Sequence, residues 1–479
     1  MTKRDFNIIV IGGGSAGLVS AYIASAVKAK VALIEKNRLG GDCLNTGCVP
    51  SKAIIRTAKI LSYIRRHKEF GIRSVSMEFD FADAMERVQS VIKKIEPHDS
   101  VERYVSLGVN CIKGKAQVIS PHEVLVNDRI WTTKNIIVAT GARPAVLNIE
   151  GLENIDYLTT DTIWGLRKKP ERLLVLGGGP IGCELAQCFA RLGIQVTLVE
   201  MAPRLLNRED AEIGQAIRVR FENEGVRVCV NAKCRKIGVE DSKRYMVIEK
   251  GDEEERIEFD QLLLAVGRKS NSRGFGLEDV GVSFNRNGAI EVDEYLRTTN
   301  HPNIYACGDV VGPYQFTHTA SHQAWYCVVN ALFSPFKKFK VDYSVIPWCN
   351  FTDPEVARVG LNEKEAQALG VAYEVLFFGM DDLDRAIIDN ENYGFVKVLT
   401  QPGKDRILGV TIVGNHAGDL IVEFVLAMKH RLGLNRILGT IHIYPTMTEA
   451  NRFAAGVWKK EHTSRFLLWL LKKIHTFRR

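Results

Sequence analysis

The chain has 479 residues, of which 46% are apolar and 25% are charged, the proportions of an ordinary soluble globular protein. At roughly 150 residues per domain, this length predicts about three domains. No run of the sequence approaches the ~20 apolar residues that a membrane-spanning helix needs. The net charge is +8, but residues 459–479 hold seven basic residues and one acid, or +6 of that total. Because the rest of the chain is nearly neutral, we expect no nucleic-acid partner.

Ten cysteines, most of them inside apolar segments, are typical of a reducing compartment. The first five residues lead directly into a predicted strand, which leaves no room for a signal peptide there. We therefore expect a cytoplasmic protein.

Residues 6–35 predict a strand, a glycine-rich turn, a helix and a second strand. The apolar run 6–11 precedes the turn Gly-Gly-Gly-Ser-Ala-Gly at 12–17, and the apolar run 31–34 ends at Glu35. Glycines in the pattern G-x-G-x-x-G let the backbone approach a pyrophosphate at a helix N-terminus, and the acid can accept hydrogen bonds from ribose hydroxyls. The predicted contributors to this dinucleotide site are Gly12, Gly14, Ser15, Ala16, Gly17 and Glu35.

Two cysteines separated by four residues, Cys43 and Cys48, follow in the glycine-rich stretch 40–52. Pro50 stands where a helix can begin, and residues 53–63 continue with a helical pattern. The positive end of a helix dipole favours a thiolate, so we expect a lowered pKa for a thiol at this helix N-terminus. The stretch predicts a redox-active dithiol beside an electron carrier, with a pair of inert buried thiols as the alternative.

Two other cysteine pairs have the same spacing, so spacing alone is weak support. Cys183 and Cys188 lie on a predicted helix, where a separation of five places them on different faces, and we expect them to pack in the core. Cys229 and Cys234 straddle a predicted strand and its exit. Only the first pair combines glycine-rich flanks, a helix start and a following lysine, Lys52.

The pattern of strand, glycine turn, helix and strand returns at 172–200. The second turn, Gly-Gly-Gly-Pro-Ile-Gly, begins at Gly177, and the acid Glu200 stands 23 positions later, as in the first unit. Two such units predict two dinucleotides, most simply a flavin cofactor and a nicotinamide substrate. Glu200 favours NAD(H) over NADP(H), because a carboxylate repels a 2′-phosphate, whereas the nearby Arg204 acts in the opposite sense. The predicted contributors from this turn are Gly177, Gly179, Ile181 and Gly182.

Apolar runs at 135–141, 261–268 and 303–309 each indicate a buried strand that ends in a glycine turn. The first two are predicted to close the nucleotide-binding sheets, where the chain crosses to its neighbour. Asp309 ends the third and can reach a ribityl chain or a phosphate-bound water, with a solvated turn aspartate as the alternative. The remaining candidate cofactor-binding residues are Gly41, Asp42, Lys52, Gly114, Ala139, Thr140, Gly141, Gly267, Arg268, Gly308 and His318.

We expect no metal site. His318 and His322 are four residues apart on a predicted helix, but no further ligand accompanies them nearby. Asp381, Asp382 and Asp384 are expected to form a solvated loop.

From residue 346 onward the pattern changes to strands, two helices and a strand, without a glycine fingerprint. Residues 420–428 predict an apolar helix face, and residues 438–444 predict an extended run. Within that run, His442 and Tyr444 are expected to point to the same side.

The following residues predict one more helix and a tail. Thr446 and Glu449 match a capping box that opens a helix continuing to Val457. In the tail, the apolar run 466–471 lies between basic groups and is too short to span a bilayer. A basic amphipathic helix with a tryptophan can lie in a membrane interface, and the alternative is a helix packed on its own subunit or a partner.

Together these motifs resemble the pyridine nucleotide-disulphide oxidoreductases, the flavoprotein family of dihydrolipoamide dehydrogenase, glutathione reductase and mercuric reductase. The resemblance covers residues 5–459 and rests on the flanked dithiol, both glycine fingerprints, Ala-x-Gly-Asp and the C-terminal Pro-Thr, in family order. It implies an α/β fold with two Rossmann-like dinucleotide-binding domains and a C-terminal α+β dimerisation domain. The expected segments are 1–150 and 271–345 for FAD binding, 151–270 for NAD(P) binding, 346–458 for dimerisation and 459–479 for a basic amphipathic tail.

The same resemblance implies FAD in the first domain, NAD(P)H as hydride donor and a homodimer whose active site uses the partner's C-terminal domain. Electrons would pass from the flavin to Cys48, the charge-transfer thiol, while Cys43 exchanges with the substrate. Lys52 resembles a lysine beside the flavin that pairs with an acid, here Glu184. A cation in that place stabilises an anionic reduced flavin.

Tyr444 departs from the family pattern. Disulphide-reducing members carry His-Pro-Thr, and their histidine is oriented by a glutamate that matches Glu449. Histidine titrates near ~6.5 and tyrosine near ~10, so Tyr444 is a poor base at neutral pH. The candidate acceptors are therefore those that need no histidine base: a small disulphide, a metal ion or a quinone-like acceptor at a membrane.

The hypothesis is an FAD-dependent NAD(P)H oxidoreductase with a redox-active disulphide, similar to dihydrolipoamide dehydrogenase, with an unidentified acceptor. One alternative is a metal-ion reductase like mercuric reductase, which delivers its metal through a C-terminal cysteine pair, whereas the last cysteine here is Cys349. The other is a membrane-docked electron-delivery flavoprotein or a transhydrogenase. Soluble transhydrogenases resemble the chain at Tyr444 but do not keep both thiols.

Overall fold

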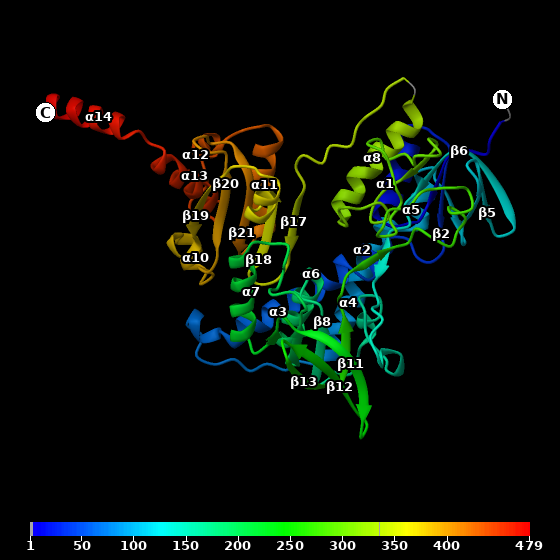
Figure 1. Ribbon diagram of the computed structural model, residues 1–479, viewed down its shortest axis with the longest axis horizontal. Helices are drawn as coiled ribbons and strands as arrows, with labels where there is room; N and C mark the ends of the chain where they lie inside the picture. The colour runs from blue at the N-terminus through cyan, green and yellow to red at the C-terminus, as the bar shows by residue number, and fades with distance from the viewer. Residues whose placement is uncertain (1–2, 335) are drawn as a thin grey trace.

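The computed structural model describes residues 3–334 and 336–479. It consists of three units, each built on its own sheet, and a helix that projects from the third (Figure 1). The resemblance to a two-nucleotide α/β fold is confirmed by this architecture. The division into segments at 150, 270, 345 and 458 stays a proposal.

The first sheet has the order β3-β2-β1-β6-β5-β4, with β16 paired to β6. β1 is parallel to both β2 and β6, and β16 is parallel to β6, so the chain returns to this sheet after building the second one. Helices α1 (Ser15–Ala26) and α8 (Thr317–Phe333) pack against each other on it. The strands are β1 (Phe6–Ile11), β2 (Val31–Glu35), β3 (Asn110–Lys113), β4 (Gln117–Ser120), β5 (Glu123–Val126), β6 (Arg129–Val138) and β16 (Ile304–Ala306).

The second sheet is parallel, with the order β10-β9-β8-β14. Helix α6 (Pro180–Arg191) follows β8 after the second glycine turn, as α1 follows β1 after the first. An antiparallel sheet of three strands lies beside it, and short strands β7 and β15 pair between the units. The elements are β8 (Arg172–Leu176), β9 (Gln195–Val199), α7 (Ala211–Asn223), β10 (Arg227–Cys229), β14 (Gln261–Leu264), β11 (Lys233–Glu240), β12 (Lys243–Lys250), β13 (Glu253–Phe259), β7 (Ala142–Pro144) and β15 (Arg268–Ser270).

The predicted places of the other cysteine pairs are largely correct. Cys183 and Cys188 are buried in α6, inside the core shared by α3, α4 and the second sheet. Cys229 ends β10, but Cys234 lies inside β11 rather than in a strand exit.

The helices that carry the dithiol begin earlier than predicted. Cys43 lies on a short helix, α2 (Gly41–Asn45), and α3 (Cys48–Arg65) begins at Cys48, two residues before Pro50. A proline is tolerated in a first helical turn, because the amide it lacks would have no helical partner. Helix α3 packs on α4 (Phe81–Ile95) and on α6.

The third unit is an antiparallel sheet of five strands in the order β17-β18-β21-β20-β19. Helices α11 (Ala417–Lys429) and α13 (Glu449–Glu461) pack on it, and their apolar residues share its core. The predicted apolar helix face at 420–428 is therefore confirmed. The other elements are β17 (Pro347–Asn350), β18 (Glu355–Gly360), α9 (Glu363–Ala368), β19 (Glu374–Gly379), α10 (Asp384–Ile388), β20 (Phe395–Thr400), β21 (Ile407–Gly414) and α12 (Leu434–Leu438).

Two predictions about residues 438–449 are wrong. The run 438–444 pairs with no strand of the described chain, so the alternation of a sheet does not apply to it: the His442 side chain is buried and the Tyr444 side chain is exposed. The capping box is only half formed, because the Glu449 carboxylate accepts the Thr446 amide at 3.3 Å while α13 begins at Glu449 itself, with Thr448 before it. The Thr446 hydroxyl donates to the carbonyl of Ile443 instead of capping the helix.

The last helix, α14 (Arg465–Phe477), follows α13 after a short turn. Figure 1 shows it projecting to the left of the third unit, away from both nucleotide-binding sheets. Among the described residues, no helix combines the length and the apolar content needed to cross a membrane.

Candidate active site

A single cleft of about 2840 Å³ joins both glycine turns and the dithiol. Most of the residues predicted from the sequence line this cleft. They are Gly12, Gly14, Ser15, Ala16, Glu35, Gly41, Asp42, Cys43, Cys48, Lys52, Ala139, Thr140, Gly141, Gly177, Gly179, Ile181, Glu184, Glu200, Gly267, Arg268, Gly308, Asp309 and His318.

Five predicted residues do not line the cleft. Gly17 and Gly182 lie behind the turns, where a Cβ at either would come within 1.8 Å of the carbonyl oxygen of Gly12 or Gly177. They are needed for close packing of helix on strand rather than for contact with a ligand. Gly114 instead donates its amide to the carbonyl of Glu35 at 2.9 Å. Tyr444 and Glu449 lie in the third unit, outside the cleft of their own chain.

Both fingerprint acids are held in the same way. Glu35 accepts hydrogen bonds from the amides of Gly13 and Asn37, each at 2.7 Å. Glu200 accepts from the amides of Gly178 at 2.5 Å and Ala202 at 2.6 Å. Each carboxylate is thereby fixed at the end of its second strand, beside the glycine turn. The remaining oxygen lone pairs can accept ribose hydroxyls.

The residues around both turns fit dinucleotides. The φ angle of Gly12 is +105° and that of Gly177 is +112°, a region that favours glycine. Gly14 and Gly179 directly precede helices α1 and α6, which have no side-chain cap from the described residues and no acid in the first turn. The free amides of their first turns, which in α6 begin at Ile181 because Pro180 has no N–H, are therefore available to a pyrophosphate, and the helix dipoles favour its charge.

The dithiol lies between two helix starts. Cys48 is the first residue of α3, and its Sγ is 3.4 Å from the hydroxyl of Thr317, the first residue of α8. A hydrogen bond from Cys43, another from Thr317 and the charge of Lys52 lower the pKa of Cys48 to about 6. The hydrogen bond to Cys48 and burial raise the pKa of Cys43. These contacts favour the thiolate on Cys48 and the proton on Cys43.

Lys52 lies one turn further along α3. Its ammonium is 2.8 Å from a carboxylate oxygen of Glu184 on α6 and 4.4 Å from the centre of the Phe351 ring. The other oxygen of Glu184 accepts the Phe351 amide at 2.9 Å. This buried glutamate thus holds a lysine from the first unit and a backbone segment from the third, at the wall of the cleft.

Arg268 brings two predicted acids together. Its guanidinium is 2.5 Å from Asp42 and 3.4 Å from Asp309. Burial raises the pKa of Asp309, although the charge of Arg268 opposes that shift. Asp309 is therefore not the solvated turn residue of the alternative interpretation.

Tyr444 and His442 have separate partners. The Tyr444 hydroxyl donates to Asp384 on α10 at 3.1 Å, and this hydrogen bond raises the pKa of Tyr444. The His442 ring is 3.0 Å from Glu423 on α11. Glu449 is buried, and its carboxylate accepts the amide of Thr446 at 3.3 Å. In the described chain no hydrogen bond joins Glu449 to Tyr444, so this glutamate does not orient the phenol as it would a histidine.

The two histidines that share helix α8 have separate backbone partners. His318 and His322 share helix α8, but their Nε2 atoms face the carbonyls of Pro347 at 2.8 Å and Asp342 at 2.9 Å. Asp384, from the acidic loop, holds Tyr444.

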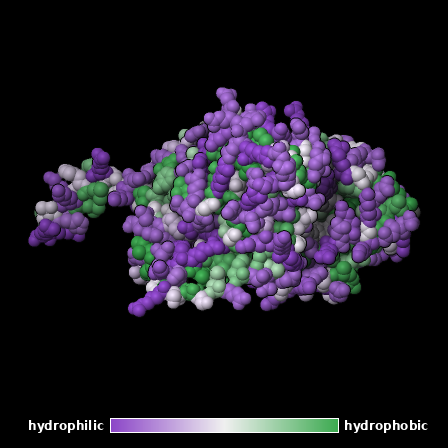
Figure 2. Space-filling model, turned by 90° about the horizontal axis from the view of Figure 1, so that it is seen from below, coloured by the Kyte–Doolittle hydropathy of each residue, from purple (hydrophilic) through white to green (hydrophobic). Residues whose placement is uncertain are grey.

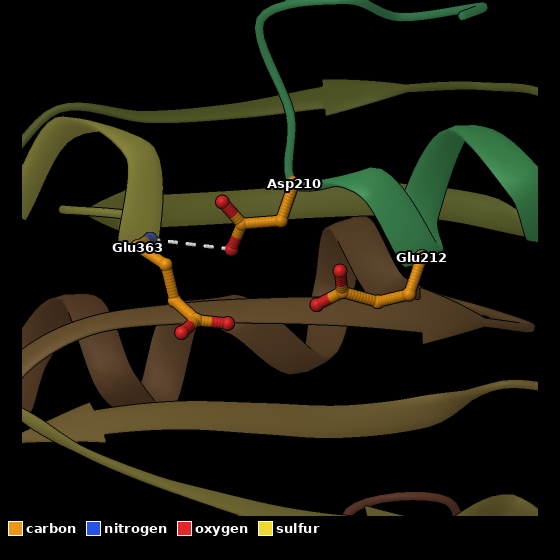
Figure 3. Close-up of side chains that lie close together, drawn as sticks. All are labelled: Asp210, Glu212 and Glu363. Atoms are coloured by element: carbon orange, nitrogen blue, oxygen red, sulfur yellow. Dashed lines mark hydrogen bonds between the residues drawn. The ribbon is translucent and has the colours of Figure 1, made fainter. Parts of the chain in front are cut away.

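One acidic cluster was not predicted from the sequence. Asp210, Glu212 and Glu363 point toward one another (Figure 3), close enough to hold a metal ion. The ammonium of the fully buried Lys397 already contacts all three carboxylates, at 2.7 Å from Asp210 and 2.6 Å from Glu363. The cluster is therefore an ion-paired junction between the second and third units.

Three residues of the site gave no recognisable pattern in the sequence. Thr317 lies 269 residues from Cys48, and Phe351 lies far from Lys52 along the chain. Asp384 was interpreted only as part of a solvated loop. Contacts between distant parts of a chain have no local motif, so only the folded structure identifies them.

The comparisons with known proteins agree with this site. Residues 6–324 match the family model described as pyridine nucleotide-disulphide oxidoreductase, and residues 346–455 match the dimerisation domain of the same family. A mercuric reductase from Staphylococcus aureus is 33% identical over 95% of this chain and 83% of its own length. A dihydrolipoyl dehydrogenase from Chlamydia pneumoniae is 35% identical over 93% of this chain and 95% of its own.

A solved structure of the HOCl-induced flavoprotein disulfide reductase RclA from Escherichia coli superposes with a TM-score of 0.83 at 27% identity, over 94% of this chain and 99% of that one. A Cu(II) complex of RclA has a TM-score of 0.84 at 26% identity, over 95% of this chain and 100% of that one. The chain therefore belongs to the pyridine nucleotide-disulphide oxidoreductases, a family of FAD-dependent oxidoreductases that use a pyridine nucleotide and a redox-active disulphide and possess a dimerisation domain.

Proposed function

We propose that the protein is an NADH-dependent reductase that reduces the Cys43–Cys48 disulphide and passes the electrons from the dithiol to a thiophilic metal ion. The observation that carries the redox role is the dithiol itself, which opens into the same cleft as both glycine turns. Bound FAD would supply the chemistry of accepting a hydride from the nicotinamide and delivering two electrons to sulphur. The side chains of this chain supply binding, charge and proton control around that exchange.

In this proposal the two thiols have different roles. Cys48 holds the thiolate, stabilised by Cys43, Thr317 and Lys52. Cys43 holds the proton and is the thiol that meets the acceptor. The Lys52–Glu184 ion pair keeps a positive charge at the cleft wall, where it stabilises negative charge that develops during reduction.

We propose NAD(H) rather than NADP(H) as the co-substrate. Glu200 is fixed by two backbone amides in the position of a ribose-binding acid, so its charge cannot easily move away from a 2′-phosphate. Arg204 remains the residue that would act against this preference.

The choice of a metal ion rests on Tyr444. A disulphide acceptor needs a base that carries a proton from one thiol to the departing sulphur, and a phenol that donates to Asp384 is a poor base near neutral pH. A thiophilic cation such as Hg(II) displaces the Cys43 proton into solvent when it binds both sulphurs, and it takes up two electrons as the disulphide re-forms, without receiving a proton. The names of two relatives support this class, since one is a mercuric reductase and another was solved as a Cu(II) complex.

A second candidate function is electron delivery at a membrane. The specific observation in its favour is helix α14, which projects from the body with an exposed apolar face and basic residues.

The test is an anaerobic titration of the purified FAD-loaded protein with NADH, followed by an acceptor screen. We expect two-electron reduction by NADH, followed by reoxidation by Hg(II) or Cu(II) at least tenfold faster than by oxidised lipoamide or glutathione disulphide. Reoxidation by oxidised lipoamide at the rate seen with the metals would contradict the metal assignment. Failure of NADH to reduce the protein at all would contradict the redox role.

A further inference from the structure

Helix α14 presents an apolar face that the described part of its own chain leaves uncovered. None of its 13 residues is buried, and each of its eight large apolar side chains is at least 38% exposed. Figures 1 and 2 show the helix standing away from the rest of the molecule. An apolar face of this kind in water marks a surface that binds something.

The spacing of the side chains makes helix α14 amphipathic. At 100° per residue, a stripe of apolar residues follows one face, with spacings of three and four that place them one above another. Arg465 and Lys472 lie on the opposite face together with Leu468 and Trp469, and Lys473 and His475 lie at the two edges of the stripe. Trp469 lies between Arg465 and Lys473 around the helix, stacked on Phe466 and with the Lys473 ammonium 5.1 Å from the centre of its ring. The stripe consists of Phe466, Leu467, Leu470, Leu471, Ile474 and Phe477.

The charge around the stripe indicates what covers it. The segment 462–479 contains five lysines and arginines and no acid. A second copy of the same helix would bring an equal positive charge to the contact, and like charges at close range are unfavourable. An anionic surface is complementary both to the basic face and to the apolar stripe.

We propose that α14 is an interfacial helix that lies in the plane of an anionic phospholipid bilayer. Its 13 residues are about 20 Å long, shorter than the ~30 Å hydrocarbon core, so the helix lies on the bilayer rather than crossing it. The apolar stripe enters the acyl boundary, and the basic side chains reach the phosphate groups. Trp469 lies at the level where tryptophan is enriched in membrane proteins.

This inference is independent of the acceptor. It requires only that the folded protein carries α14 outward, and no residue of α14 lines the catalytic cleft. Lipid binding can therefore fail while the redox chemistry holds, and the reverse is also possible.

The test is co-sedimentation of the full-length, FAD-loaded protein with vesicles. We expect binding to vesicles of phosphatidylcholine with 30% phosphatidylglycerol, and at least tenfold weaker binding to pure phosphatidylcholine or in high salt. Each basic residue contributes about a fivefold gain in affinity near an anionic surface, so K472Q/K473Q together should weaken binding more than tenfold. L470E/L471E should abolish it, because two charges would enter the acyl boundary.

The matched control is Thr476→Gln, a change on the polar face that should leave lipid binding unaltered. All these variants should keep the NADH-dependent activity and the oligomeric mass of the unaltered protein. Absence of binding to the anionic vesicles at low salt would overturn the proposal. So would unchanged binding of L470E/L471E, or a loss of oligomeric mass in that variant, which would show that the stripe packs on a second copy.

Discussion

At the scale of single residues, the two thiols of the dithiol differ in charge. Because the thiolate is stabilised on Cys48, only this sulphur can give the long-wavelength absorbance of a thiolate beside an oxidised flavin. We expect Cys48→Ser to lack this absorbance in every redox state, whereas the matched variant Cys43→Ser, which cannot form the disulphide, should show it before any reduction, while the flavin is oxidised. A visible spectrum of each purified variant decides the assignment, and persistence of the band in Cys48→Ser would reverse the two roles.

The titration of Cys48 should also make the long-wavelength absorbance depend on pH. A lowered pKa means that the charged form is present above about pH 6 and is lost as the pH falls through that value. The absorbance should therefore be half-maximal near pH 6 in the unaltered protein. Thr317→Val removes a hydrogen-bond donor to Cys48 and should move the midpoint upward, whereas Thr317→Ser should leave it in place. Equal midpoints in all three proteins would exclude a role for Thr317.

Tyr444 is proposed to exclude efficient disulphide exchange. General acid–base catalysis by a positioned histidine contributes about 10²–10⁴-fold to a rate, so Tyr444→His should raise turnover with dihydrolipoamide by about tenfold or more. Tyr444→Phe is the control and should not raise it. The measurement is steady-state reduction of NAD⁺ by dihydrolipoamide, and no gain in the histidine variant would show that another feature determines the acceptor.

At the scale of elements, helices α1 and α6 each pack against the preceding glycine turn at a glycine, Gly17 in α1 and Gly182 in α6. A Cβ on Gly182 would lie 1.8 Å from the carbonyl oxygen of Gly177, while a Cβ on Gly179 would have no described atom within 4 Å. Gly182→Ala should therefore destabilise the protein by about 1–3 kcal/mol through displacement of α6.

The control for this prediction lies in the same turn. Gly179→Ala should leave the thermal unfolding temperature unchanged and raise only the KM for NADH, because the added methyl group would point into the open cleft. Thermal unfolding without nucleotide separates the two effects. Equal unfolding temperatures for both variants would contradict the packing role of Gly182.

At the scale of the whole molecule, a buried lysine connects the second and third units. Burial alone would lower the pKa of Lys397, but hydrogen bonds to Asp210, Glu212 and Glu363 raise it. Removing one partner of a buried ion pair typically costs about 3–5 kcal/mol, so Lys397→Met should destabilise the junction by this amount. Lys404→Met, at an exposed position of the third unit away from this junction, should cost little. Chemical denaturation measures both, and equal stability of the two variants would show that the cluster has no structural role.

The sequence determined the local units of this protein and their chemistry. Glycine turns, the strands before them, the acids after them and the flanked dithiol are runs of neighbouring residues, so spacing and side-chain type were sufficient to predict both nucleotide turns, Cys43 and Cys48. The sequence was also sufficient to predict α14, because the amphipathic spacing of its apolar and basic residues is contained within one helix.

The tertiary structure alone decided which distant groups meet. It placed Thr317 beside Cys48 and Asp384 beside Tyr444, it surrounded Lys397 with three acids, and it separated His442 from Tyr444 because no neighbouring strand imposes alternation on them. These contacts depend on how whole sheets and helices pack, since their free energy comes from residues brought together from far along the chain. The spacing of residues within one segment does not determine which distant segments pack against it.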